Sequence, residues 1–266
     1  MALPIWPYQT IGDSYRPAII FLHGFMGAGT DWLSTAKNLA DYFYCILPDL
    51  PGHGWNTGFP LNHPLDFETV ADGLRQLIDR LGLTQTHLVG YSLGGRIALY
   101  TAICYPQLIS TLVIESANPG LEDESARRSR AGLDDQRAEQ IVAQGLDAFV
   151  EQWYQLDLFR SLQTRPELLD SIKVRRKKND PHWTAKIIRE LSPGRQPPLW
   201  DRLDSLPMPT LLLAGALDPA YTAIVTQMGQ KIRQATIEIV PDAGHNIHLE
   251  QPETLSQVLR EFLQKK

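Results

Sequence analysis

Short apolar runs alternate with amphipathic segments along most of this chain, and this alternation constrains its fold more than any other feature. The runs are too short for helices and lack the strict polar alternation of half-exposed strands, so we expect buried strands. They are residues 17–23, 42–47, 86–90, 108–114, 210–215 and 235–240. Helices are expected between them, at about residues 32–40, 66–81, 93–105, 220–233 and 252–263. This order predicts an α/β fold with a mostly parallel, doubly wound sheet and right-handed crossovers.

The middle of the chain interrupts this pattern with a charged segment of helical composition. Residues 120–200 hold 14 of the 25 lysines and arginines. The simplest interpretation is a solvated helical surface. The alternative is an inserted helical cap whose inner face presents some of these cations to an anionic ligand. We therefore expect a core domain of residues 1–119 and 201–266, with a cap formed by residues 120–200.

Composition excludes several classes of protein. A chain of 266 residues with 43% hydrophobic and 21% charged residues is ordinary for a globular domain, and a net charge of −5 argues against a nucleic-acid partner. Cys45 and Cys104 lie in apolar runs and are expected to be buried thiols in a reducing compartment. Residues 1–7 lack a basic leader region, and no apolar stretch approaches membrane-spanning length. We expect a cytoplasmic protein without membrane insertion, while the oligomeric state stays open.

The segment after the third predicted strand carries the clearest catalytic pattern. It reads Gly90-Tyr91-Ser92-Leu93-Gly94, a G-x-S-x-G pattern between a predicted strand and a predicted helix. Glycines suit such a sharp turn because no side chain fits beside the raised serine. Ser92 would then lie at a helix N-terminus, where unpaired N–H groups favour negative charge. We predict a nucleophile elbow, against the alternative of a glycine-rich turn whose serine only caps the helix.

The two partners that a catalytic serine needs follow later in the chain. A serine hydroxyl requires a histidine base that is oriented by a carboxylate, and elbow folds supply these in the order Ser, Asp or Glu, His. Asp218 and His245 follow the last two predicted strands and are the expected partners. Glu115 is the weaker alternative for the acid. We expect His248 on the surface or at a helix start, and His87 to be structural.

Two other strand ends are interpreted as supporting loops. In elbow enzymes the loop after the first strand provides one backbone N–H donor of the oxyanion hole, and the residue after the nucleophile provides the other. Here these donors are the N–H groups of Phe25 and Leu93. His23 is expected to brace its loop, and Asp49 and His53 are expected to be structural. No nucleotide-binding glycine loop, metal-ligand cluster or cofactor lysine motif is visible, so no cofactor or metal is expected.

Together these residues resemble the α/β-hydrolase superfamily over about residues 17–260, with a cap inserted after the fourth predicted strand. The chain departs from that family at its start, where only sixteen residues precede the first predicted strand and leave little room for an opening hairpin. A narrower resemblance is to the MenH family, 2-succinyl-6-hydroxy-2,4-cyclohexadiene-1-carboxylate synthase. It rests on Gly90-Tyr-Ser-Leu-Gly-Gly-Arg96, on Glu115-Ser-Ala-Asn-Pro-Gly-Leu121 with an arginine-rich helix after it, and on Phe149-Val-Glu-Gln-Trp153.

The MenH resemblance implies a lyase of menaquinone and phylloquinone biosynthesis. Its reaction eliminates pyruvate from a cyclohexene that carries a succinyl chain, a carboxylate and an enolpyruvyl ether. The resemblance implies substrate contacts at Tyr91, Arg96, Arg127, Trp153 and Arg176. Arg130 is a further candidate, and Arg175 is the alternative if the match to Arg176 is shifted by one residue. Arginine suits a substrate with several carboxylates because its guanidinium binds carboxylate through two hydrogen bonds. The alternative role for Arg96 is a salt bridge to an acid of the cap.

Two other functions remain open at this level. A carboxylesterase or thioesterase would use the same triad through an acyl-serine and would need an apolar pocket. A binding module would keep the fold and the cap without catalysis. In the lyase, Ser92 would act as the base that removes a ring proton, assisted by His245 and Asp218.

Overall fold

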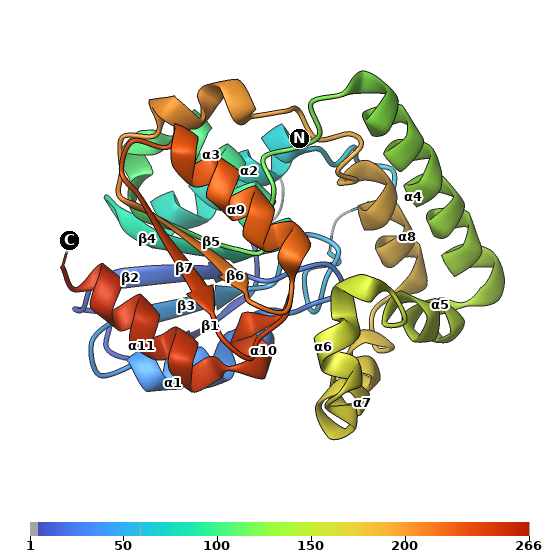
Figure 1. The fold of residues 1–266 in the computed structure, drawn as a ribbon, viewed down its shortest axis with the longest axis horizontal. Coiled ribbons are helices and arrows are strands. Elements are labelled where there is room, and N and C mark those ends of the chain that lie inside the picture. The colour runs from blue at the N-terminus through green and yellow to red at the C-terminus, as the bar shows by residue number, and fades with distance from the viewer. Residues whose placement is uncertain (1–4, 59, 266) are drawn as a thin grey trace.

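A twisted sheet of seven strands forms the centre of the computed structural model, which describes residues 5–58 and 60–265 (Figure 1). Residues 1–4, which belong to the segment examined for a leader region, lie outside the described residues. The strand order is β1-β3-β2-β4-β5-β6-β7, and all pairs are parallel except β1 with β3. The strands are β1 Tyr8–Ile11, β2 Ala18–Leu22, β3 Tyr44–Pro48, β4 Thr86–Tyr91, β5 Ile109–Glu115, β6 Thr210–Gly215 and β7 Ala235–Val240.

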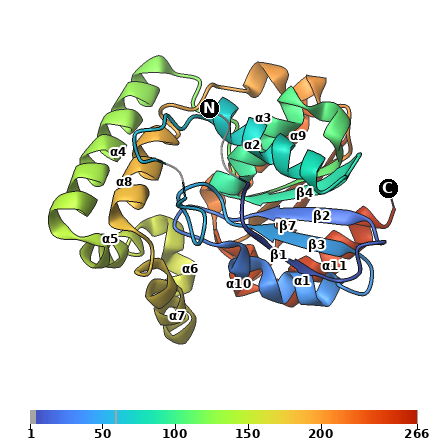
Figure 2. The same ribbon diagram turned by 180° about the vertical axis from the view of Figure 1, so that it is seen from behind.

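Helices cover both faces of this sheet (Figures 1 and 2). One face packs against α2, α3 and α9, and the other against α1, α10 and α11. Their bounds are α1 Leu33–Leu39, α2 Phe67–Arg80, α3 Leu93–Cys104, α9 Pro219–Lys231, α10 Ile247–Glu250 and α11 Pro252–Leu263. Because both faces are covered, β2, β4 and β6 are buried along their whole length. The mostly parallel, doubly wound α/β sheet is therefore confirmed.

Local signals in the sequence set the ends of these helices. The Asp66 carboxylate accepts a hydrogen bond from the Thr69 N–H at 2.8 Å and caps α2 at its N-terminus. Gly82 follows this helix with a φ of +67°, a conformation that favours glycine at helix ends. Every predicted strand and helix bound lies within two residues of the observed one.

Five further helices stand beside the sheet, between β5 and β6 in the chain (Figure 1). They are α4 Glu124–Gln144, α5 Leu146–Trp153, α6 Arg160–Gln163, α7 Pro166–Arg176 and α8 Pro181–Glu190. The helices α4 and α8 run side by side in both views. Several of these helices share a small hydrophobic core with Met26 from the loop after β2. The added helices thus pack onto the edge of the sheet where the strands end.

Three expectations about burial and strand content are corrected. The short strand β1 precedes the first predicted strand, and its mostly exposed residues give no apolar signal. The predicted buried strand at 235–240 is an edge strand, and three of its central residues are exposed. Cys104 is exposed at the end of α3, whereas Cys45 is buried as expected.

None of the helices in the described part of the chain combines the length and apolar character needed to cross a lipid bilayer.

Candidate active site

Ser92 lies in a strained turn between β4 and α3. Its φ of 50° and ψ of −111° are unusual for a residue with a side chain. The flanking glycines allow this turn because a Cβ on Gly90 would lie 2.4 Å from the Gly94 carbonyl oxygen. A Cβ on Gly94 would lie 2.3 Å from the carbonyl oxygen of Leu22 in β2. The turn therefore has the form of a nucleophile elbow, with the serine at the N-terminus of α3.

The structure brings Ser92, His245 and Asp218 together from the ends of three strands. His245 Nδ1 lies 2.8 Å from an Asp218 carboxylate oxygen, and His245 Nε2 lies 3.3 Å from Ser92 Oγ. When Nδ1–H donates to Asp218, the lone pair of Nε2 faces the serine hydroxyl and can accept its proton. Asp218 also accepts the N–H of Tyr221 at 3.2 Å, so it caps α9 and is held in place by that helix.

Glu115, the alternative acid, has a different partner. Its carboxylate accepts hydrogen bonds from His248 Nδ1 at 2.8 Å and from the His248 N–H at 3.2 Å. His248 is buried and stacks on Trp32 at a ring distance of 4.4 Å, so the expectation of a surface position was wrong. His248 is the second residue of the short helix α10, so the other half of that expectation, a position at a helix start, is confirmed.

The other histidines of the strand ends are structural. His23 Nε2 accepts the Leu50 N–H at 2.9 Å, and its Nδ1 lies 2.8 Å from the Gly24 carbonyl oxygen, so it braces its loop. Burial lowers the pKa of His23 to about 4, which keeps this ring neutral. His87 Nδ1 bonds to Thr111 Oγ1 at 2.8 Å inside the sheet.

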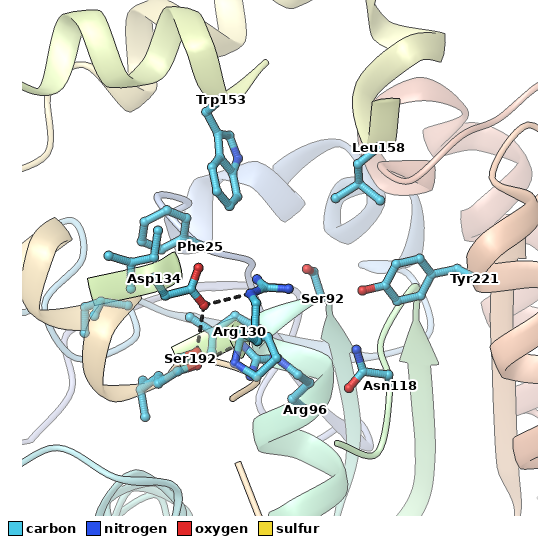
Figure 3. A pocket seen from close by; sticks show the side chains of 15 residues that line it. Phe25, Ser92, Arg96, Asn118, Arg130, Asp134, Trp153, Leu158, Ser192 and Tyr221 are labelled. Atoms are coloured by element: carbon cyan, nitrogen blue, oxygen red, sulfur yellow. Dashed lines mark hydrogen bonds and ion pairs between the residues drawn. The ribbon is translucent and has the colours of Figure 1, made fainter. Parts of the chain in front are cut away.

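A pocket of about 260 Å³ opens above Ser92, between the sheet and the added helices (Figure 3). The lining residues that carry polar groups are Ser92, Arg96, Asn118, Arg130, Asp134, Ser192 and Tyr221. Phe25, Trp153 and Leu158 supply apolar walls. Figure 3 shows the Tyr221 hydroxyl pointing toward Ser92, with Trp153 and Leu158 on the side opposite the sheet.

Arg96 is buried in this pocket without an acidic partner among the described residues. Its guanidinium donates to the Leu191 carbonyl oxygen at 3.0 Å and to Gln196 Oε1 at 3.2 Å, both neutral acceptors. Burial lowers the pKa of Arg96 to about 10, so this group stays a cation at neutral pH. The alternative of a salt bridge from Arg96 to a cap acid is thus not realised in this structure. A buried cation without a counter-ion is costly, and an anionic ligand would compensate it.

Arg130 reaches the same pocket from α4. Its Nε donates to Asp134 at 2.8 Å, and Asp134 is fully buried. The same carboxylate also accepts from Arg137 at 2.9 Å and from Ser192 Oγ at 2.7 Å. Two guanidinium groups surround one carboxylate, so this cluster keeps one net positive charge beside the pocket.

The structure does not bring every expected substrate residue to this pocket. Arg127 donates to the carbonyl oxygens of Leu121 and Glu122, and it fixes the start of α4 outside the pocket lining. Arg176 is buried in an ion pair with Asp31 at 2.7 Å. Although burial opposes it, Arg176 holds the pKa of Asp31 below its usual range.

Arg176 and its neighbour Arg175 line a separate cavity of about 440 Å³, together with Met26 and Gly27 from the loop after β2. Tyr91 is buried between His245 and His248, with distances between ring centroids of 5.4 and 4.5 Å. Its ring therefore packs against the catalytic histidine candidate, His245. Trp153 does line the pocket above Ser92.

Sequence reasoning missed Tyr221 and Asn118 as pocket residues. Burial raises the pKa of Tyr221, so its hydroxyl stays protonated and can donate a hydrogen bond toward a ligand. Tyr221 lies three residues after Asp218, in the first turn of the helix that the aspartate caps. That position was a usable signal, because the first turn of a helix after an active-site loop faces the same site.

Phe25 and Leu93, the expected oxyanion donors, both line the pocket beside Ser92. Leu93 is the first residue of α3, where backbone N–H groups have no acceptor within the helix. An oxyanion placed against this helix end would also gain from the helix dipole. Among the residues that the structure describes, no group of three or more His, Cys, Asp or Glu side chains is placed to hold a metal ion.

Comparisons with known proteins agree with this fold. The family model described as the alpha/beta hydrolase fold matches residues 17–252. The chain is 37% identical to the putative 2-succinyl-6-hydroxy-2,4-cyclohexadiene-1-carboxylate synthase of Bacillus subtilis, over 95% of this chain and 92% of that protein. It is 35% identical to the chloroplastic protein PHYLLO of Arabidopsis thaliana, over 95% of this chain but only 16% of that much longer protein.

The comparison of structures gives a similar answer. The structure of MenH from S. aureus superposes with a TM-score of 0.92 at 31% identity, covering 97% of this chain and 98% of that one.

Proposed function

The chain belongs to the 2-succinyl-6-hydroxy-2,4-cyclohexadiene-1-carboxylate synthase (MenH) family of α/β-hydrolase-fold enzymes, and we propose that it catalyses that family's reaction. The enzyme eliminates pyruvate from an enolpyruvyl-cyclohexene carboxylate that also carries a succinyl chain. The product is 2-succinyl-6-hydroxy-2,4-cyclohexadiene-1-carboxylate, an intermediate of menaquinone and phylloquinone biosynthesis. This activity makes the protein a carbon–oxygen lyase rather than a hydrolase.

The observation that carries this proposal is the buried Arg96 guanidinium beside Ser92, which has two neutral acceptors and the Phe67 ring as partners but no carboxylate in an ion pair among the described residues. An esterase acting on neutral acyl groups gains nothing from a buried cation in its pocket, whereas a substrate with several carboxylates would form charge-assisted hydrogen bonds to it. Arg130 adds a second guanidinium, which Asp134 holds in place while the Ser192 hydroxyl donates to that carboxylate. The hydroxyl of Tyr221 supplies a neutral donor on the opposite wall.

The triad would work as a base in this reaction. His245 takes the proton of Ser92 Oγ as the serine oxygen removes a ring proton next to the succinyl carbonyl. The enolate that forms is stabilised by the N–H groups of Phe25 and Leu93. As the double bonds of the ring shift, the bond between the ring carbon and the enolpyruvyl oxygen breaks. Pyruvate leaves as its enolate, which takes up a proton and becomes the keto acid.

We further propose that residues 120–200 act as a cap over this pocket. Support comes from Arg130, Trp153 and Leu158, which line the pocket from this segment. The substrate would lie between the cap and the sheet, shielded from water that could quench the enolate. Free thiols at Cys45 and Cys104 support a reducing compartment, and we place the reaction in the cytoplasm.

A coupled assay for pyruvate tests this function directly. The purified chain is mixed with the enolpyruvyl substrate, and pyruvate is detected with lactate dehydrogenase and reduced nicotinamide cofactor. The same preparation is screened against p-nitrophenyl esters and analysed by mass spectrometry for an acyl adduct on Ser92. Stoichiometric pyruvate without an adduct supports the lyase. Ester turnover with an acyl-Ser92 species, and no pyruvate, would support a hydrolase instead.

A further inference from the structure

Glu250 is a buried carboxylate that lies beneath the loop of His245. One of its oxygens accepts the Gly244 N–H at 3.1 Å, and the other accepts the Asn246 N–H at 3.3 Å. These two N–H groups flank His245 on either side. The carboxylate has no cationic side chain as an ion-pair partner in the described part of the chain, so its hydrogen bonds must stabilise its charge.

A third donor to this carboxylate comes from the cap. Ser161 Oγ in α6 donates to Glu250 Oε1 at 3.1 Å, and both residues are buried. The approach is close, since a Cβ added to Gly244 would lie 1.9 Å from Ser161 Oγ. Only a glycine at this position lets the cap helix meet the histidine loop.

Arg165 makes a second link between the same two segments. Its guanidinium donates to the Glu250 carbonyl oxygen at 2.6 Å and to the Asp242 carbonyl oxygen at 2.7 Å. Asp242 has a φ of +54°, so the loop turns sharply where this arginine holds it. The arginine thus fixes both ends of the loop that carries the histidine.

The linked cap segment also reaches the pocket itself. Leu158 lines the pocket, and the Phe159 ring lies edge-on to the His245 ring at a centroid distance of 6.1 Å. The stretch from Leu158 to Arg165 therefore contacts the substrate space, the imidazole and the loop below it.

We propose that Glu250 is a positioning residue that couples the cap to the catalytic histidine. Its hydrogen bond from Ser161 ties its position to that of the cap. Its hydrogen bonds from the Gly244 and Asn246 N–H groups fix the position of His245 relative to Asp218 and Ser92. The link to catalysis rests on the proposed function. A misplacement of about 1 Å at a catalytic group can reduce the rate by about 10²-fold, so small shifts of this loop matter.

Two variants and a matched control test this coupling. Glu250→Gln keeps the shape of the side chain but replaces one accepting oxygen with an NH₂ group, so one loop N–H loses its partner. Ser161→Ala removes only the hydrogen bond that the cap donates to the Glu250 carboxylate. Glu167→Gln removes a carboxylate charge from an exposed position in α7 and serves as the control. The assay separates kcat from KM for pyruvate release, and proton NMR follows the downfield resonance of the His245 Nδ1–H that faces Asp218.

For Glu250→Gln we expect kcat to fall at least about tenfold with KM within about twofold, because Arg96 and Arg130 are untouched. Ser161→Ala should lower kcat about threefold, and both variants should shift or broaden the downfield resonance. The control should match the wild type in both measurements. If Glu250→Gln does not fold, Ser161→Ala decides the question alone.

A lower melting temperature with an unchanged kcat and an unmoved resonance would overturn the coupling. The resonance requires no substrate, so it separates the two proposals. A wild type that releases no pyruvate while the resonance still responds to Ser161→Ala would reject the lyase function and retain the positioning role.

Discussion

Arg96 is a buried cation without a carboxylate partner in an ion pair among the described residues. It lies in the first turn of α3, where the helix dipole disfavours a cation, and it is buried with neutral acceptors only. The same helix end favours an anion. The Arg96 guanidinium and the N–H groups around Ser92 are therefore close enough to bind one negatively charged molecule together. In the proposed reaction, affinity for the substrate and stabilisation of the developing enolate would therefore arise within a single turn of helix.

We predict that Arg96→Ala mainly weakens substrate binding. Loss of a charge-assisted hydrogen bond costs about 1.5–3 kcal/mol, which corresponds to a rise of about 10- to 100-fold in KM for pyruvate release. Steady-state kinetics give the comparison, with Arg128→Ala as control because that arginine is well exposed on α4. A KM equal to that of the control would show that Arg96 does not contact the substrate.

Among the helices, α4 determines by its orientation whether Arg127 or Arg130 can contact a ligand in the pocket. Arg127 and Arg130 are three residues apart, yet only Arg130 lines the pocket, while Arg127 binds carbonyl oxygens at the start of the helix. We predict that Arg130→Ala raises KM about tenfold or more, whereas Arg127→Ala changes KM less than threefold. Parallel kinetic measurements on the two variants provide the check. The reverse order of effects would mean that the cap binds substrate through a different face of α4.

The close packing of α3 on the sheet leads to a prediction about stability. A Cβ on Gly94 would meet the Leu22 carbonyl oxygen at 2.3 Å, so Gly94→Ala should lower the free energy of unfolding by about 2 kcal/mol or more. Gly132 lies inside α4 with open space around its Cβ position, so Gly132→Ala should raise stability by about 0.5–1 kcal/mol. Urea unfolding measures both. Equal effects at the two sites would contradict the packing described for the elbow.

At the scale of the whole molecule, buried neutral histidines make the fold sensitive to acid. Burial lowers the pKa values of His23 and His87 to about 4 and that of His53 to about 3. Below the ordinary histidine pKa of about 6.5 the unfolded chain binds protons that the folded chain does not, so stability falls as the pH decreases from about 6.5 toward 4.

We therefore predict that each of these histidines costs about 2 kcal/mol of stability between pH 7 and pH 5. Urea unfolding at the two pH values measures the total loss, and His87→Gln should reduce that loss by about 2 kcal/mol. A loss that is the same in the wild type and in His87→Gln would show that this ring is not kept neutral by the fold.

Most of the core architecture could be predicted from the sequence because strands buried on both faces leave continuous apolar runs. The triad residues were candidates for a related reason, since the carboxyl ends of parallel strands meet at one edge of the sheet. The short edge strand β1 gave no signal, because its exposed residues need no apolar pattern. Residue spacing alone could not show which face of α4 points toward the pocket, so it could not tell whether Arg127 or Arg130 lines it. The pairing of Arg176 with Asp31 joins positions far apart in the chain, and no local pattern encodes it.

In the proposed reaction Ser92, activated by His245 and Asp218, removes a proton from a carboxylate-rich substrate held by Arg96 and Arg130. The most direct measurement is the single-turnover rate of pyruvate release by the wild type and by Ser92→Ala at saturating substrate. We expect the variant to be slower by at least about 10³-fold, since it loses the base that the oxyanion hole and the arginines cannot replace. Pyruvate release by Ser92→Ala at the rate of the wild type would show that Ser92 is not the base.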